Sequence, residues 1–151
     1  MVMPMRVPRA AAVLGALGLI PFVGLALGAA ASDAPSRASM ITPMVAYGAV
    51  ILSFLGGIQW GLALRHGGDG TPRTGLLWLS VSPSLAGWAA MLLPSRTASA
   101  ILLAGCFAVV LTVDVWLSRR GDAPPWYPRL RIPLTIVAAT CLTGAATAAA
   151  L

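Results

Sequence analysis

The sequence predicts an all-α integral membrane protein, a bundle of five transmembrane helices, and two features of composition and one of pattern predict this class. Of the 151 residues, 58% are hydrophobic and only 9% are charged, whereas a soluble domain carries about 25% charged residues. The mean hydropathy is +0.87, and the charged residues are ten arginines and four aspartates, without lysine or glutamate. These polar groups are too few to cover a water-soluble globule of this size.

The pattern is a series of five apolar runs of about 20 residues, long enough as helices to cross a hydrocarbon core of about 30 Å. The expected helices cover residues 10–31, 43–64, 75–93, 97–118 and 132–151. The longest connection, 119–131, has 13 residues. We therefore expect residues 1–151 to form a single transmembrane domain with no extramembrane domain.

The first run follows Arg6 and Arg9 and has two interpretations. Residues 29–31 are all alanine and precede Ser32, which fits the A-x-A cleavage site of a secretory signal peptide. The run is longer than the usual apolar region of about 7–15 residues, and Pro21 interrupts it. We expect the first helix to be retained in the membrane.

Prolines mark several other helices. Thr42 and Pro43 predict an N-cap with proline at the first helical position, and Pro133 predicts a similar start for the last helix. Pro21 and Pro83 fall inside the first and third runs, where each is expected to kink its helix.

The arginines predict the orientation of the bundle. If the N-terminus is cytoplasmic, two arginines lie outside (Arg37 and Arg96) and eight lie on the cytoplasmic side: Arg6, Arg9, Arg65, Arg73, Arg119, Arg120, Arg129 and Arg131. Cytoplasmic loops carry an excess of such residues, so we expect an N-in, C-out topology. Because the arginines are scattered between apolar runs rather than gathered on one polar face, we expect no nucleic-acid partner.

The second helix contains a stripe of small residues at every fourth position. Its members are Ala49, Ser53, Gly57 and Gly61. Such stripes let two membrane helices approach closely, and we expect this one to serve helix packing.

A polar cluster is predicted at a common depth in four helices. Its members are Gln59, Ser80, Asp114 and Thr135, each roughly 5–8 Å below the cytoplasmic interface at a rise of about 1.5 Å per residue. Asp114 is the one ionisable residue well inside a run, and an intramembrane carboxylate is a candidate functional group. The structural alternative is an ion pair with Arg73, Arg119 or Arg120. A proton relay would need a second titrating group, and His66, in a predicted loop, is the one available.

The connection from 118 to 133 is the richest polar segment, with four arginines, four prolines and adjacent aromatic residues. Aromatic rings favour headgroup depth, and guanidinium groups bind lipid phosphates. This segment is therefore either a membrane anchor or a docking surface for anionic lipid or a partner. The residues concerned are Arg119, Arg120, Trp126, Tyr127, Arg129 and Arg131.

Two cysteines and one histidine are too few for a tetrahedral zinc site or an iron–sulfur cluster. The sequence also contains no recognisable nucleophile–base pair or catalytic carboxylate pair. We expect no catalytic residues, no metal and no cofactor.

Four segments carry a family resemblance: VPRAAAVLGALGLIPF (7–22), YGAVILSFLGGIQWGLAL (47–64), PSLAGW (83–88) and WYPRLRIPLT (126–135). Through them the chain resembles the transmembrane protein 69-like family, also called domain of unknown function 3429. The resemblance implies a small multi-pass protein of the bacterial inner membrane, or of a mitochondrial membrane in a eukaryote, with the first helix retained. It brings no established activity, catalytic residue or cofactor.

Three functional hypotheses follow. The leading one is a non-enzymatic accessory, assembly or partner-docking component that contacts anionic lipids of the bilayer, a larger membrane complex or another copy of itself. The first alternative is a small-solute or proton-linked carrier or channel protomer that uses Asp114. The second is a tryptophan-rich membrane ligand-binding sensor, suggested by the helix number and five tryptophans.

Overall fold

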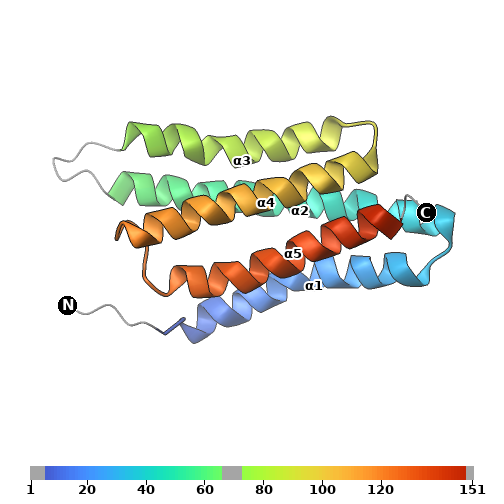
Figure 1. Ribbon diagram of the computed structural model, residues 1–151, viewed down its shortest axis with the longest axis horizontal. Helices are drawn as coiled ribbons and strands as arrows, with labels where there is room; N and C mark the ends of the chain where they lie inside the picture. Colours follow the sequence, from blue (N-terminus) through green and yellow to red (C-terminus); the bar gives the residue numbers. More distant parts are fainter. Residues whose placement is uncertain (1–5, 66–72, 149–151) are drawn as a thin grey trace.

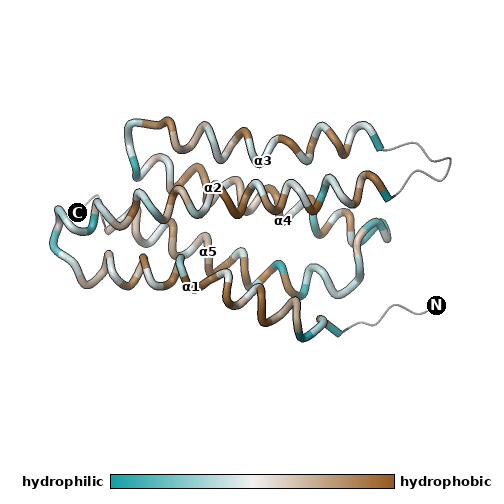
Figure 2. Tube along the Cα trace, turned by 180° about the vertical axis from the view of Figure 1, so that it is seen from behind, coloured by the Kyte–Doolittle hydropathy of each residue, from teal (hydrophilic) through white to brown (hydrophobic). Residues whose placement is uncertain are grey.

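A computed structural model describes residues 6–65 and 73–148, and within these ranges the chain forms five α-helices and no strand (Figure 1). The helices are α1 (Arg9–Ala31), α2 (Ala34–Arg65), α3 (Thr74–Leu92), α4 (Arg96–Arg119) and α5 (Tyr127–Ala148). All five are long and apolar enough to cross a membrane. Hydrophilic residues gather towards the two ends of the bundle (Figure 2). The predicted class, an all-α bundle of five membrane helices, is confirmed.

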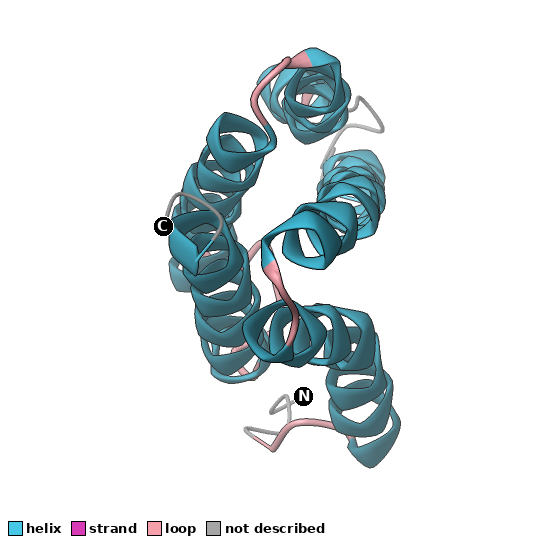
Figure 3. Cartoon of the chain, turned by 90° about the vertical axis from the view of Figure 1, so that its right-hand side faces the viewer, coloured by secondary structure: helices cyan, strands magenta, loops and turns pink. Residues whose placement is uncertain are grey.

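Consecutive helices run in opposite directions, so the bundle has an up-and-down arrangement (Figure 1). Helix α2 packs against each of the other four helices, and a view along the bundle shows the helices end-on (Figure 3). Helix α3 packs on α2 and α4, and α1 packs on α2 and α5. The long second helix is therefore the element that positions the rest.

Aromatic contacts attach α1 to the interior. The ring of Phe22 makes edge-on contacts with Tyr47 on α2 and Phe107 on α4, at centroid distances of 5.1 and 6.0 Å. The Tyr47 hydroxyl donates to the carbonyl of Gly18 at 2.9 Å. Of the 23 residues of α1, Phe22 and Ala29 are buried. Because so little of α1 is buried, this helix is held by a few specific contacts.

Helix α2 begins nine residues before the predicted start. Asp33 accepts a hydrogen bond from the backbone N–H of Ser36 at 3.3 Å and so caps the first turn, and Pro35 occupies that turn, where a missing N–H removes no helical bond. The predicted start at Thr42 and Pro43 is wrong, since Pro43 lies inside the helix. One lost backbone bond is tolerated there because neighbouring side chains are buried and hold the helix together. These side chains are Ile41, Met44 and Val45.

Helix α5 begins at Tyr127, five residues before the predicted start. Pro128 stands in the first turn, where proline is tolerated, and Pro133 is the seventh residue, so the prediction that Pro133 lies at the start is wrong. The residues after Tyr127 are therefore helical rather than part of a hairpin loop. This extension turns one side of the segment inwards, because residues four apart share a helix face. The other three helices match their predicted ranges within one residue at each end.

The small-residue stripe on α2 does not form the helix contact predicted for it. Ala49 is buried and lies against Gly87 of α3, where an added Cβ would be 3.2 Å from the Cβ of Ala49. Ser53 is exposed, and an added Cβ at Gly57 or Gly61 would meet nothing within 4 Å. At 100° per residue, a repeat of four turns by about 120° over twelve residues, so the stripe rotates out of the interface.

The contact face of α2 instead follows alternating steps of three and four residues. Its buried members are Ala49, Leu52, Gly56, Gln59 and Ala63. Gly56 makes the closest approach, because a Cβ there would lie 2.3 Å from the backbone oxygen of Ser80 on α3. Gly56, rather than Gly57, is therefore the glycine that permits close helix packing.

Candidate functional site

Three polar side chains from three helices form a hydrogen-bonded cluster inside the bundle, which we call the buried triad. It consists of Gln59 on α2, Asp114 on α4 and Arg131 on α5. The Nε2 of Gln59 donates to Oδ1 of Asp114 at 3.2 Å, and the Nε of Arg131 donates to Oδ2 at 2.9 Å. Asp114 and Gln59 are each 1% exposed and Arg131 is 6% exposed. Both carboxylate oxygens are thus bound, and the negative charge is balanced by an adjacent positive charge.

The partner of Asp114 differs from those expected. Arg73 pairs with Asp122, while Arg119 and Arg120 are exposed. The ion pair of the structural alternative is therefore present, but the three partners named for it are wrong. Arg131 takes that place because α5 begins early enough to bring its fifth residue inside. The spacing of residues in this segment was a sign of it. The buried residues of α5 include a set that recurs every three or four positions, as on one face of a helix: Tyr127, Arg131, Thr135, Ala138 and Leu142.

The predicted polar cluster is entirely buried, although its members have different roles. Gln59 and Asp114 are in direct contact. Ser80 is 3% exposed, and its hydroxyl donates to the carbonyl of Leu77 at 2.7 Å in the α2–α3 interface. Thr135 is 4% exposed and lies one helical turn beyond Arg131. The structure therefore brings two of the four residues together and adds an arginine that the prediction had assigned to the surface.

The predicted docking residues divide between surface and interior. Arg119, Arg120 and Arg129 are exposed, and Trp126 is half-buried. The Arg120 guanidinium lies 4.4 Å from the centre of the Trp116 ring, a cation–π contact at the end of α4. Tyr127 and Arg131 are 7% and 6% exposed. Placing these two on a docking surface was wrong, because the early start of α5 turns both towards the core.

A cavity of about 350 Å³ adjoins the buried triad, and we call it the interhelical cavity. It is lined by residues between 11 and 22 of α1, between 51 and 58 of α2 and between 126 and 138 at α5, with Phe107 of α4. Its lining is apolar apart from a few side chains, which include Tyr127, Arg131 and Thr135. This volume falls in the range of about 300–1,000 Å³ typical of small-molecule sites.

The same three lining residues carry unsatisfied polar atoms. Within the described ranges, the buried side-chain atoms without a hydrogen-bond partner are the hydroxyl oxygens of Tyr127 and Thr135 and one terminal nitrogen of Arg131. Buried polar groups in native proteins are nearly always paired with protein, water or ligand. These three atoms are therefore free to bond a molecule at the polar end of the interhelical cavity.

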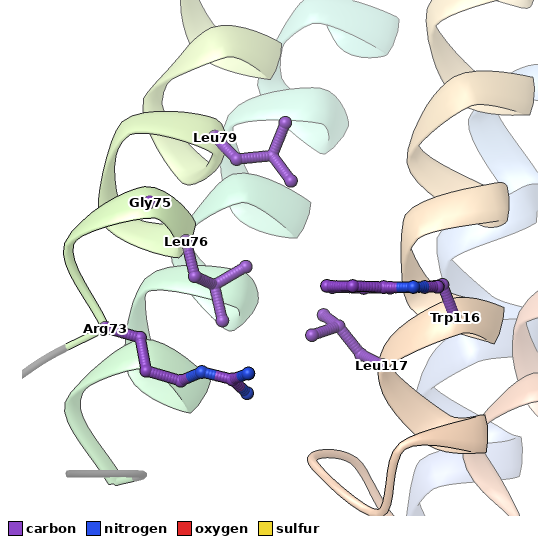
Figure 4. Close-up of a pocket in the computed structure, with 6 residues that line it drawn as sticks. All are labelled: Arg73, Gly75, Leu76, Leu79, Trp116 and Leu117. Atoms are coloured by element: carbon purple, nitrogen blue, oxygen red, sulfur yellow. The ribbon is translucent and has the colours of Figure 1, made fainter.

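A second hollow, of about 250 Å³, lies between α3 and α4 (Figure 4). Leu76 and Leu79 face Trp116 and Leu117 across it, and Arg73 lies at one end. Arg73 is already paired with Asp122. This hollow adds no unsatisfied polar group, so the interhelical cavity is the better candidate for a ligand.

Metal ligands do not gather in the part of the chain that the structure describes, where no group of three or more His, Cys, Asp or Glu side chains could hold an ion. His66, the predicted second titrating group, lies outside the described residues.

Comparison with known proteins identifies relatives over nearly the whole chain. The family described as "Protein of unknown function (DUF3429)" matches residues 7–147. Transmembrane protein 69 of Xenopus tropicalis is 37% identical over 140 residues, which cover 91% of this chain and 53% of that protein. Transmembrane protein 69 of Mus musculus is 36% identical over 137 residues, 87% of this chain and 53% of that protein. The chain thus spans about half the length of these curated relatives, and no solved structure matches it.

Proposed function

The chain belongs to the DUF3429 family, and for this multi-pass membrane protein we propose a non-enzymatic accessory role, in which the arginine-rich end of the bundle docks on anionic lipid headgroups beside a larger membrane complex. The membrane we propose is the bacterial inner membrane, or a mitochondrial membrane in a eukaryote. The single observation that carries the proposal is the closure of the buried triad: Arg131 and Gln59 occupy both oxygens of Asp114.

A carrier that couples transport to protonation needs a carboxylate that exchanges protons or binds its cargo in turn. Asp114 is 1% exposed and bound on both oxygens, so its role in this proposal is to join α2, α4 and α5. The polar groups of the triad are likewise engaged with one another rather than arranged around a substrate, which favours a role other than catalysis.

The docking surface in this proposal lies at the end of the bundle that carries the N-terminus of α1 and the C-terminus of α4. Exposed arginines gather there, namely Arg6, Arg9, Arg65, Arg119, Arg120 and Arg129. Near an anionic membrane surface each such residue contributes about 1 kcal/mol of attraction. Trp116, 47% exposed, lies beside Arg120 as an interfacial anchor.

The test is purification of the full chain from its native membrane in nanodiscs, followed by identification of bound proteins and lipids. We expect a stoichiometric protein partner together with enriched anionic lipid. Replacing both Arg119 and Arg120 by Gln should reduce that enrichment, whereas Arg96→Gln, at the opposite end, serves as the matched control and should leave it unchanged. A protein without partner or lipid enrichment, or a reconstituted protein that shows Asp114-dependent proton or solute flux, would overturn the proposal.

The ligand-binding alternative has one observation in its favour, the interhelical cavity.

A further inference from the structure

The polar end of the interhelical cavity presents hydrogen-bond donors. Arg131 can only donate, and the hydroxyls of Tyr127 and Thr135 can each donate one hydrogen bond. Each of the three residues has a buried polar atom without a partner. All three atoms can donate and Arg131 cannot accept, so a ligand with acceptor oxygens would satisfy them.

The charge around these donors favours a neutral acceptor. Arg131 is already neutralised by Asp114 at 2.9 Å, so this end of the cavity has no net charge. A carboxylate or phosphate bound to Arg131 would lie close to the Asp114 carboxylate, and like charges repel strongly in a low-dielectric interior. A carbonyl oxygen accepts the same hydrogen bonds without that repulsion.

The rest of the cavity favours an apolar chain that enters from the lipid. Leu14 on α1 and Phe54 on α2 both line the cavity, yet they are 69% and 63% exposed on the lipid-facing surface. The cavity therefore opens sideways between α1 and α2. From Arg131 to Ala138 the lining extends by about 10 Å along α5 at a rise of about 1.5 Å per residue, enough for part of an alkyl or prenyl chain.

We propose that the interhelical cavity binds one neutral amphiphile, whose carbonyl oxygens accept hydrogen bonds from Tyr127, Arg131 and Thr135 and whose apolar chain extends between α1 and α2. Acylglycerol esters and prenylquinones share this chemistry. The site is interior and does not depend on the docking surface, so either proposal can fail alone.

Binding is measured on the purified full chain in maltoside micelles, with native mass spectrometry for stoichiometry and tryptophan fluorescence for affinity. The probes are 1,2-dioctanoylglycerol for the ester, decylubiquinone for the quinone and decanoate as an anionic comparison. We expect saturable binding of one molecule of a neutral probe, tighter than that of decanoate. The tighter of the two neutral probes identifies the source of the carbonyl.

Two substitutions test the two ends of the ligand, each with a control on the same helix. Thr135→Val removes a donor and should weaken binding about tenfold, the equivalent of one lost hydrogen bond, whereas Thr143→Val, at an exposed position, should not. Gly18→Leu fills the cavity and should abolish binding. Gly24→Leu lies outside the lining, has nothing within 4 Å of its added Cβ and should leave binding unchanged.

Thr135→Val also separates ligand binding from a structural role. Since the Thr135 hydroxyl has no partner in the protein, the unliganded variant should unfold at the same temperature as the parent or higher. If Gly18→Leu does not fold, Thr135→Val decides the question. The proposal is overturned if binding of the neutral probes does not saturate, which would mean that only water occupies the donors. It is also overturned if decanoate binds most tightly, or if the variants and their controls bind the probes equally well.

Discussion

Replacing Asp114 by Asn is expected to destabilise the bundle by about 3–5 kcal/mol, the usual effect of breaking a buried ion pair by removing one partner. The substitution keeps the size of the side chain and its hydrogen bond with Gln59. It removes the anion that lies 2.9 Å from Arg131, a residue whose side chain is 8% exposed. The variant therefore retains a buried guanidinium charge with no counter-ion.

The same reasoning predicts strong coupling between the two residues. Arg131→Met should be destabilising by a similar amount, because it leaves the Asp114 carboxylate buried with only the amide of Gln59. The double variant Asp114→Asn/Arg131→Met contains no buried charge, and its remaining loss should be about 1–3 kcal/mol, the effect of imperfectly paired polar groups. The coupling free energy of the cycle should therefore be about 3 kcal/mol or more.

The free energy of unfolding is measured by SDS titration in mixed micelles, followed by tryptophan fluorescence and circular dichroism. Asp122→Asn is the matched control, because it breaks a pair with Arg73 whose side chains are 14% and 37% exposed; such a partly exposed pair contributes about 0–1 kcal/mol. Additive losses in the cycle, or an Asp114→Asn variant within about 1 kcal/mol of the parent, would refute the structural role of the triad. A stable Asp114→Asn variant that had lost solute or proton flux would support the carrier alternative instead.

Two further predictions concern helix packing and capping. Gly56→Ala should destabilise the α2–α3 pair by roughly 1–3 kcal/mol, because the new Cβ would lie 2.3 Å from the Ser80 oxygen; Gly57→Ala, with open space around it, should be neutral or stabilise by up to about 1 kcal/mol. SDS titration of both variants checks this, and the reverse ranking would contradict the packing. At the start of α2, hydrogen bonds from Ser36 hold the pKa of Asp33 below 3.8, so the cap is complete above the unfolded pKa and is lost as pH falls through the lower folded pKa. An NMR titration should find this pKa below 3.8 and find it raised by Ser36→Ala, and an ordinary pKa for Asp33 in the parent would exclude the cap.

The number and type of the helices could be predicted because each apolar run is long and bounded by arginine or proline. The first residues of α2 and α5 were harder to predict, because proline is compatible both with the first turn of a helix and with its interior when neighbouring residues are buried. Pro43 and Pro133 were taken as starting residues, whereas Pro35 and Pro128 occupy the first turns of α2 and α5. Choosing among successive prolines requires the tertiary contacts.

These local differences decided how much of the site could be predicted. The predicted depths of Gln59 and Asp114 along their helices placed the two residues at the same level, and they are in contact. This prediction was possible because the rise per residue of a helix is fixed. Arg131 was missed as the partner because its segment was interpreted as a loop, in which the direction of a side chain has no helical period. Once the segment is helical, Tyr127, Arg131 and Thr135 share one face, and a surface arginine becomes part of an internal site.

The two arginines that oppose the predicted N-in orientation have local partners at helix ends. Arg37 donates to the carbonyls of Ala29 and Ser32 at 3.2 Å and to that of Ala148 at 2.6 Å, at the C-terminal ends of α1 and α5. Arg96 donates to the carbonyl of Met91 near the end of α3 at 3.2 Å. A cation is favourable at a helix C-terminus, where the last carbonyls lack partners within the helix.

At the opposite end of the bundle, the buried position of Arg131 lowers the number of arginines that favour the N-in orientation. Its charge is balanced by Asp114, so it contributes little to the positive charge of the loops that are expected to be cytoplasmic. Without it, the count of arginines changes from eight against two to seven against two, and the bias remains strong. The predicted N-in, C-out topology therefore depends on Arg73 and on the six exposed arginines of the proposed docking surface, and it does not need the arginine of the buried triad.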